Sequence, residues 1–404
     1  MSEEPTTVLD FPQRLPDLRE RLKLGLWELI GDFAEEELRE ALAAGRHERA
    51  EGRRGHRNGH VERELLSEYG PCQVRLPRAQ VWDEKGAKSE WHSRIVGRYQ
   101  RRTKRVDEAI LGCYLGGANT RRIRKALSPL WGDGLLSKSA ISRLVGKLKE
   151  RFDAWRARDL SRESCKYLFL DGLRVAVRLA RRVVKVPVLV ALGVRENGRK
   201  VLLAISIAGS ESLGSWGKLV EDLKKRNLSD PILTICDGNQ GLVGSVRTLW
   251  PQADVQRCLK HKLDNLLDHA PKHCHAELKR DFHEVHFGES PEAVKTAYEG
   301  FRAKWAKLCP AVVRSLDEAG EDLLTFTQYP QSQWSVLRTT NHIERLNGEF
   351  RRRVKTQGSF PTEDAALVLL WGLVAFGQIE LRRIRGYQDL PKVIAAKDSL
   401  KKAA

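Results

Sequence analysis

The chain has 404 residues, of which 41% are hydrophobic and 31% charged. This length suffices for two or three domains and this apolar content for real cores, which excludes a disordered protein. Lysine and arginine outnumber aspartate and glutamate by 71 to 53, so the formal net charge is +18. Such an excess favours a polyanion or an anionic membrane as the partner, and nucleic acid is our first expectation.

Three features favour a cytoplasmic chain without a membrane partner. The opening MSEEPTTVLDFPQR lacks the apolar centre of a signal peptide. The longest apolar run, residues 366–376, is too short to cross a bilayer and predicts a buried helix. The seven cysteines are scattered without the spacing of a disulfide framework, so we expect reduced thiols.

The first part of the chain, residues 1–96, predicts a helix followed by a small mixed module. Apolar side chains recur at helical spacing over residues 22–46, which is typical of a packing or dimer helix. Glycine-rich basic loops then alternate with short strand-like pieces such as ERELLSE and CQVRLPR. We expect dimerisation and DNA binding from this part.

Residues 97–160 begin with the basic VGRYQRRTKR and continue as three helical segments. Ser137 is the expected N-cap of the third helix. The pattern resembles a helix-turn-helix whose last helix enters a major groove, although any surface three-helix unit has the same pattern. The residues that we expect to contact DNA here are Arg101, Arg102, Arg121, Arg122, Ser139, Arg143 and Lys147.

Beyond residue 165 the apolar period changes from that of a helix to that of a strand. KYLFLDGLRVAVRL, VVKVPVLVALGV and KVLLAISIAG are successive strand candidates, followed by the helical WGKLVEDLKKRN and the apolar strand PILTICDG. We predict an α/β core over residues 161–261 whose sheet begins with sequential antiparallel strands. A helical insertion over residues 262–335 and the completion of the core over residues 336–404 follow.

Asp171 and Asp237 are acids in otherwise apolar strands. Burying a lone carboxylate costs several kcal/mol unless a cation offsets its charge. Each acid also has a structural explanation, because Asp171 with Gly172 is a hairpin signal and Asp237 is placed to cap the next helix. Against the hairpin, one long strand over residues 167–179 makes better use of the break at residues 180–182.

A third acid opens the stretch SVLRTTNHIERLNGEFRRRVKTQG, residues 335–358. On a helical period, one stripe is apolar and the adjoining stripe consists of Glu344, Asn347, Arg351 and Lys355. Asn341 followed by Glu344 also fits an N-cap with its reciprocal acid, which is the structural explanation of this glutamate. On the functional interpretation, Asn347, Arg351 and Lys355 contact DNA.

A pair of divalent cations would account for Asp171, Asp237 and Glu344 together. Two ions would neutralise the three carboxylates and activate water or a 3′-hydroxyl for attack on a phosphate. Mg²⁺ fits ligation by carboxylates best, and Mn²⁺ is the alternative. We therefore expect these three acids to be catalytic metal ligands.

Four stretches together resemble the bacterial Mutator-type insertion-sequence transposases. They are Asp171-Gly172, Asp237-Gly238, RCLKH at residues 257–261 and TTNHIERLNGEFRRRVKTQGSFPTEDAAL at residues 339–367. The upstream GHRNGHVERELL, QVRLPR, RYQRR and SAISRLVGKLKE are also similar to that family, so the similarity covers about residues 40–375. The TTN-x-IE-x-LN helix with the downstream KT-x-G-x-FP is the specific part of the likeness.

The resemblance implies an α+β, multidomain chain. Its ribonuclease H-like mixed α/β core would contain a mainly helical insertion, in which Trp305 and Trp334 are expected to pack, and would follow an N-terminal DNA-binding region. The acidic triad would be Asp171, Asp237 and Glu344. His342 and Arg345 depart from the family, since many relatives have small residues there.

The resemblance also implies the reaction and the partners. The metal pair would help water hydrolyse the bond at an element end, and the freed 3′-hydroxyl would then attack a phosphodiester in another strand, without a nucleotide cofactor. The partners would be double-stranded DNA, as element terminal repeats and as target, and at least a second copy of the chain, since two ends must be held together.

Three alternatives remain open. Cys258 and His261, followed by His269, His273, Cys274 and His275, have spacings that a structural zinc ion uses, whereas the resemblance makes the first two residues that shape the active site. A metal-dependent endonuclease that cuts without joining would need the same acids. A DNA-binding regulator with a degenerate core would lack at least one acid, and all three are present.

Overall fold

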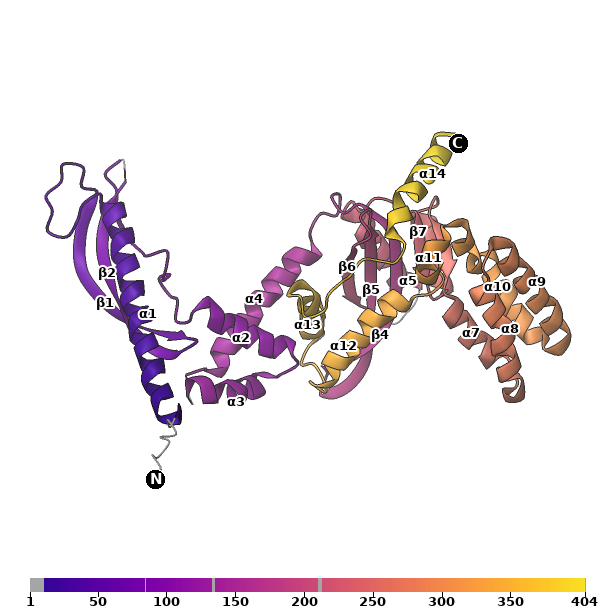
Figure 1. Ribbon diagram of the computed structural model, residues 1–404, viewed down its shortest axis with the longest axis horizontal. Coiled ribbons are helices and arrows are strands. Elements are labelled where there is room, and N and C mark those ends of the chain that lie inside the picture. Colours follow the sequence, from indigo (N-terminus) through magenta and orange to yellow (C-terminus); the bar gives the residue numbers. More distant parts are fainter. Residues whose placement is uncertain (1–10, 84, 133–134, 210–212, 404) are drawn as a thin grey trace, which may run out of the picture. The chain divides into compact units, whose positions relative to one another are not determined.

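The computed structural model describes residues 11–403 apart from residues 84, 133–134 and 210–212 (Figure 1). Contacts divide the chain into two units, Met1–Gly146 and Lys147–Ala404, which we describe in turn. Helix α4 continues from the first unit into the second. The division of the chain into five functional segments stays a prediction.

The first unit begins with α1 (Phe11–Leu42), which packs on a small antiparallel sheet. Strands β1 (Gly55–Ser67) and β2 (Gly70–Trp82) form a hairpin, and β3 (Lys88–Glu90) pairs with β2. The apolar contacts between α1 and this sheet involve Ala34, Leu38, Leu42, Leu65, Val74, Leu76 and Ala79. The predicted strand pieces ERELLSE and CQVRLPR are confirmed, since they form most of the paired lengths of β1 and β2.

Three helices follow as predicted: α2 (Lys104–Leu115), α3 (Thr120–Trp131) and α4 (Lys138–Arg156). Ser137 caps α4, because its Oγ accepts a hydrogen bond of 3.1 Å from the backbone N–H of Ala140. The apolar stripe of α4 is buried, and the side chains predicted to face away from it are exposed: Ser139, Arg143 and Lys147.

The second unit is built on a five-stranded sheet of order β6-β5-β4-β7-β8. Its strands are β4 (Cys165–Leu179), β5 (Arg182–Arg195), β6 (Lys200–Ile207), β7 (Leu233–Cys236) and β8 (Asp254–Arg257). The first three pair antiparallel in sequence order, as predicted, whereas β7 is parallel to both β4 and β8. The strand of this sheet that comes first in the chain, β4, is therefore the central one.

A two-residue turn joins β4 to β5 after Leu179, which pairs with Arg182. Both turn residues have positive φ, 44° at Ala180 and 69° at Arg181, which is the turn type that matches the twist of a hairpin. The alternative hairpin at Asp171 is wrong, because β4 passes through that residue without a break.

Helices cover both faces of this sheet. On one face, α5 (Leu213–Lys225) and α6 (Gln240–Leu249) pack on the even-numbered residues of β4, such as Leu168 and Leu170. Phe169 and Asp171 point to the opposite face, because side chains alternate along a strand. There Phe169 contacts His342 and Asp171 bonds Asn347, both on α12 (Asn341–Lys355).

The chain between the sheet and α12 is helical, as predicted. It contains α7 (Leu259–Asp268), α8 (His275–Phe287), α9 (Pro291–Leu308), α10 (Pro310–Ala319) and α11 (Gln331–Leu337), with short 3₁₀ turns at Lys272–Cys274, Gly320–Leu323 and Thr325–Gln328. Trp305 and Trp334 are 0% and 5% exposed, so the prediction that they pack in the core is confirmed.

The chain ends with α13 (Glu363–Ala375), a 3₁₀ turn (Tyr387–Asp389) and α14 (Leu390–Ala403). The apolar run predicted to be a buried helix lies in α13, where Leu369, Leu370 and Leu373 are fully buried. Among the helices described, none combines the length and the apolar character that crossing a bilayer requires.

Candidate active site

Strand register places Asp171 next to Asp237. Parallel strands β4 and β7 pair through Leu170 and Cys236, and an acid follows each of these residues. Neighbouring strands lie about 4.8 Å apart, so the two carboxylates arise from adjacent positions of the sheet. Asp171 sits within its strand, whereas Asp237 lies just beyond the carboxyl end of β7.

Asp171 is a buried acid, with 7% of its surface exposed. Burial raises its pKa to about 6, and the negative charge of Asp237 adds to that rise. The N–H of Gly172, the charge of His261 and a hydrogen bond from Asn347 oppose it. Asn347 Nδ2 donates that bond to Asp171 Oδ2 at 2.7 Å.

The second polar atom of the Asn347 side chain, Oδ1, is a buried hydrogen-bond acceptor. The residue is completely buried, and its Oδ1 has no hydrogen-bond partner among the described residues. Because Asn347 has no exposed surface in this structure, its predicted role as a DNA contact stays a prediction. The bond from Asn347 to Asp171 ties α12 to β4, and the unpartnered Oδ1 of Asn347 is open to a water molecule or a cation.

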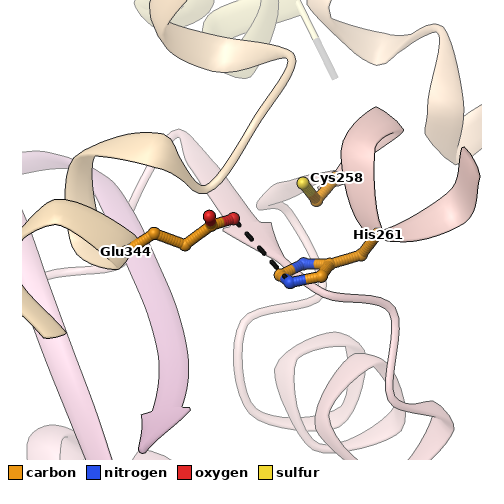
Figure 2. Close-up of side chains that lie close together, drawn as sticks. All are labelled: Cys258, His261 and Glu344. Carbon is orange, nitrogen blue, oxygen red and sulfur yellow. Dashed lines mark ion pairs between the residues drawn. The ribbon is translucent and has the colours of Figure 1, made fainter. Parts of the chain in front are cut away.

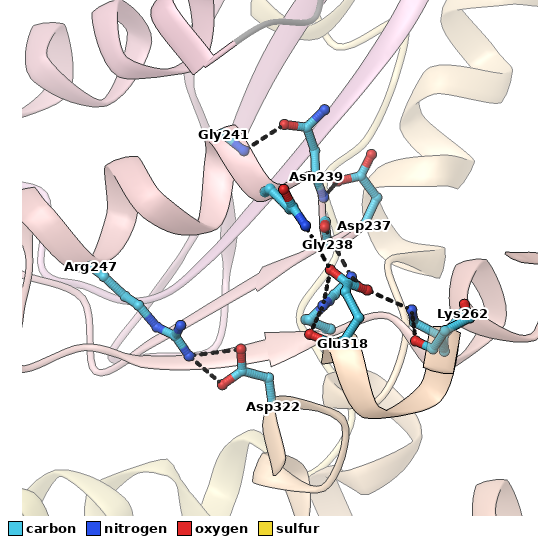
Figure 3. Close-up of polar contacts among 11 residues, drawn as sticks. Asp237, Gly238, Asn239, Gly241, Arg247, Lys262, Glu318 and Asp322 are labelled. Atoms are coloured by element: carbon cyan, nitrogen blue, oxygen red, sulfur yellow. Dashed lines mark hydrogen bonds and ion pairs between the residues drawn. The ribbon is translucent and has the colours of Figure 1, made fainter. Parts of the chain in front are cut away.

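Asp237 does not cap the following helix. Asn239 performs that task, since its Oδ1 accepts a hydrogen bond of 3.0 Å from the backbone N–H of Gly241 (Figure 3). It also accepts one of 3.3 Å from the N–H of Leu242. Asp237 Oδ1 accepts one bond, of 3.0 Å, from the N–H of Asn239. The structural explanation of Asp237 as a helix cap is therefore wrong.

A network of ion pairs with two buried cations supports the loop after Asp237 (Figure 3). Arg257 donates to Gly238 O at 3.0 Å and to both carboxylate oxygens of Glu318, which also binds Lys262 at 2.9 Å. Burial alone would raise the pKa of Glu318, but bonds from these two cations outweigh it and lower the pKa to about 2. Gly238 has φ 89°, and a Cβ there would lie 2.3 Å from Arg257 Nε.

Glu344 lies in the first turn of α12. The N-cap is Thr340 rather than the predicted Asn341, which is already helical, so the explanation of Glu344 as a partner of an Asn341 cap is wrong. Thr340 Oγ1 donates to Glu344 Oε1 at 2.8 Å, and Lys260 Nζ donates to Oε2 at 2.6 Å. Glu344 and Asn347 are three residues apart on one helix, so the bond from Asn347 to Asp171 links the helix of Glu344 to the strand of Asp171.

Cys258, His261 and Glu344 form a cluster whose potential ligand atoms all lie within 4.8 Å of one another (Figure 2). His261 Nε2 is 3.7 Å from Glu344 Oε1. Contact with the Cys258 thiol raises the pKa of His261 to about 9, and burial of the ring opposes the rise. Burial would raise the pKa of Cys258, but the bond and charge of His261 lower it. The other zinc candidates, His269, His273, Cys274 and His275, are not part of this cluster.

His342 packs on the sheet beside the site. Its ring lies edge-on to Phe169 with centroids 5.9 Å apart, and its Nδ1 is 3.4 Å from Lys200 Nζ. Burial, with the charges of Lys200 and Arg345, lowers its pKa to about 4. The imidazole is therefore neutral near pH 7.

The residues predicted to contact DNA differ in their surroundings. Arg101, Arg121, Arg122, Ser139, Arg143, Lys147, Arg351 and Lys355 are exposed. Arg102 is partly buried, and its Nε donates to Asp107 at 2.7 Å. Arg351 and Lys355 lie one and two turns beyond Asn347 on α12, so they continue the face that begins at Glu344.

Asp171 and Asp237 thus lie at neighbouring positions of the sheet, and Glu344 lies in the first turn of the helix that bonds Asp171. Among the described residues, the cluster of possible metal ligands that contains Glu344 consists of Cys258, His261 and Glu344 and includes neither aspartate. Sequence patterns indicated the acids from their apolar surroundings. They did not indicate Asn347 as a partner of Asp171, nor Glu318 and Arg257 behind Gly238, because these contacts join residues 176, 61 and 19 positions apart. For Glu344 the available signal was its place in the polar stripe that adjoins the apolar stripe of the helix.

Known proteins resemble the chain over most of its length. Residues 13–378 match the family described as Transposase, Mutator family. The transposase for insertion sequence element ISRM5 of Rhizobium meliloti (strain 1021) is 32% identical over 367 residues, 91% of this chain and 89% of that relative. The transposase for element IS1081 of Mycobacterium tuberculosis (strain ATCC 25618 / H37Rv) is 32% identical over 365 residues, 89% and 86% of the two chains. The transposase for element IS256 in transposon Tn4001 of Staphylococcus aureus is 29% identical over 371 residues, 90% and 91%. This chain therefore belongs to the Mutator family of transposases.

Proposed function

We propose that this transposase binds the ends of its element, cleaves DNA strands by metal-assisted hydrolysis and joins the freed 3′-hydroxyl to a new phosphodiester. The observation that carries the proposal is the register of Asp171 beside Asp237, with α12 bonded to Asp171 through Asn347. The sheet order, with its first strand central, supports a ribonuclease H-like core. The protein would bind DNA in the cytoplasm, where it would associate with the nucleoid.

Asp171, Asp237 and Glu344 would hold two Mg²⁺ ions, or Mn²⁺ in their place. The donor set fits hard divalent cations, because it consists of carboxylates and a buried amide oxygen that lacks a partner among the described residues. Bound ions supply Lewis-acid activation of the attacking oxygen and stabilise charge on the phosphate. Lys260 Nζ donates a hydrogen bond to Glu344 Oε2, and this bond would break when a metal ion binds that oxygen.

The chain's own residues position the acids and the DNA. Asn347 orients the Asp171 carboxylate, and Cys258 with Thr340 holds the His261 ring beside Glu344. Like Cys258, His261 acts through Glu344 and shapes the site. Its positive charge balances part of the negative charge of the acids until a cation binds.

DNA would be bound along two exposed basic faces. We propose that α2, α3 and α4 form a helix-turn-helix in which Ser139, Arg143 and Lys147 face the groove. Arg101, Arg121 and Arg122 would contact phosphates, as would Arg351 and Lys355 beyond the site. Arg102 would contribute less, since its guanidinium is paired with Asp107.

The test uses purified protein, terminal-repeat DNA and Mg²⁺ or Mn²⁺, scored for nicking and for joined product. Asp171→Asn, Asp237→Asn and Glu344→Gln are each expected to abolish cleavage and to leave DNA affinity within about twofold. Arg143→Ala is the control with the opposite effect. It should weaken DNA binding by about 1 kcal/mol and leave the cleavage rate unchanged when all the DNA is bound by protein.

The outcomes separate this proposal from its rivals. Nicking without a joined product would indicate an endonuclease that does not join. Binding without nicking would indicate a DNA-binding regulator. Full cleavage by the Asp237→Asn variant would overturn the metal-assisted mechanism.

A further inference from the structure

Helix α1 has two apolar faces. The inner face, Ala34, Leu38 and Leu42, is buried on the sheet of the first unit. The outer face consists of four large side chains that are about half exposed: Leu18 (55%), Leu22 (49%), Leu29 (54%) and Phe33 (53%). At 100° per residue these four fall within an arc of about 60°, roughly opposite the inner face.

Such a stripe is unusual on a protein surface. The positions from Leu18 to Phe33 span about 22 Å of helix, and all four large side chains point the same way. Contiguous apolar patches of this kind mark interaction sites, because water would otherwise cover a large apolar area. The inner face already stabilises the unit, so the outer stripe needs another occupant.

The spacing of the stripe is symmetric. Leu18 and Phe33 lie equally far from a midpoint between Gly25 and Leu26, and so do Leu22 and Leu29. When α1 meets an antiparallel copy about that midpoint, Leu18 faces Phe33 and Leu22 faces Leu29. A self-complementary surface of this kind is what a twofold axis requires. Gly25 at the axis permits close approach, since a Cβ there would contact nothing within 4 Å.

The charges of α1 favour an antiparallel over a parallel pair. Residues 18–24 contain three cations, Arg19, Arg21 and Lys23, and one acid. In an antiparallel pair about that midpoint, residues 18–24 lie opposite residues 27–33, which contain two acids, Glu28 and Asp32, and no cation. The antiparallel arrangement therefore places these acids beside the cations of the other helix, whereas a parallel arrangement places acid beside acid and cation beside cation.

We propose that α1 pairs antiparallel with α1 of a second copy of this chain, through Leu18, Leu22, Leu29 and Phe33. The pairing is an isologous interface with its twofold axis between Gly25 and Leu26. It gives the expected homo-oligomer a specific surface. It does not depend on the metal chemistry, because the residues involved lie in the first unit and the acids in the second.

Cysteine cross-linking of the full chain tests the geometry. In the antiparallel pair, the two copies of residue 18 lie about 22 Å apart along the helix, far beyond the reach of a disulfide. Leu18→Cys alone and Phe33→Cys alone should therefore give no more covalent dimer than the unsubstituted protein with its seven native thiols. An equal mixture of the two variants should give a covalent dimer on mild oxidation.

Sedimentation velocity tests the energetics with a matched control. Leu22→Ala with Leu29→Ala should raise the dimer dissociation constant at least tenfold, whereas Leu24→Ala, 64% exposed but off the stripe, should not. Circular dichroism checks that the variants keep their helix content. Efficient cross-linking of Leu18→Cys alone would overturn the antiparallel arrangement. Absence of the mixed disulfide together with a monomeric parent protein would overturn the interface. If the same protein still cleaves terminal-repeat DNA, the proposed function is unaffected by that result.

Discussion

Asp171 is an acid in an environment that favours its neutral form. Its pKa is raised to about 6 by burial, so in the metal-free protein the ionised carboxylate destabilises the fold above that pH. Its favourable contribution is complete below the usual pKa of 3.8 and is lost as the pH rises through about 6. A divalent cation would remove this penalty, because it pairs with the ionised form.

The change Asp171→Asn should therefore stabilise the metal-free protein at pH 8 and leave its stability nearly unchanged at pH 4. A shift of about two pKa units corresponds to at most about 3 kcal/mol in the free energy of unfolding. Denaturant unfolding at the two pH values measures the difference. Adding Mg²⁺ should stabilise only the parent, and equal stabilisation of both proteins by Mg²⁺ would contradict a metal site at Asp171.

Asn347 offers a second prediction at the same scale. Asn347→Leu removes the bond to Asp171 Oδ2, and we expect cleavage to fall by about ten- to a hundredfold, the equivalent of one good hydrogen bond to a charged group. DNA affinity should hold, since Asn347 is buried. The control is Arg351→Ala, one turn further on the same helix and exposed, which should weaken binding and spare the chemistry. Weakened binding by Asn347→Leu would contradict the positioning role.

Individual residues were predictable where a single stretch of sequence contained the signal. Asp171, Asp237 and Glu344 stand out because each acid interrupts an apolar or helical pattern. Asn347 lies in the same helical stripe as cations, and its burial depends on β4, which is distant in the sequence. A helix pattern indicates which residues share a face and not which of them meets the sheet.

At the scale of elements, the turn between β4 and β5 contains two residues that are unfavourable for its backbone conformation. Ala180 and Arg181 both adopt positive φ, which asparagine and glycine adopt at lower cost. Ala180→Asn with Arg181→Gly should raise the free energy of unfolding by about 1 kcal/mol. Thermal unfolding of the double variant measures this gain. Ala180→Asn alone should give about half of that gain and serves as the control.

Most helices and strands were predictable from the sequence, whereas the contacts between elements distant in the chain were not. Apolar alternation predicted β4, β5, β6 and β7, and Ser137 predicted the start of α4. The strand β8 was missed, since it is only four residues long and polar. Its buried Gln256 is satisfied by the carbonyls of Arg257 and Leu323, the second from the distant helical segment.

At the scale of the molecule, the Glu318 network joins α10 to the edge of the sheet. Arg257 and Lys262 are nearly buried, so Glu318→Gln would leave both with a poorer partner. We expect a loss of up to about 3 kcal/mol in the free energy of unfolding at pH 7, reduced from the value for a fully buried pair because Glu318 is a third exposed.

The pH dependence of that loss follows from the lowered pKa of Glu318. The stabilisation is complete above the usual pKa of 4.5 and is lost as the pH falls through about 2. The gap between parent and variant should therefore narrow between pH 4.5 and pH 2 in denaturant titrations. A gap that stays constant over this range would show that the ion pairs are not the cause.

The position of α12 late in the chain has a consequence for incomplete synthesis. Both aspartates and the whole sheet precede the helical segment, and Glu344 follows it. A chain that stops between residues 258 and 340 keeps the entire first unit and both aspartates and loses the third acid. On the proposed function, such a shortened product would occupy element ends without cutting them, and would act as a competitor of the full-length protein encoded by the same reading frame.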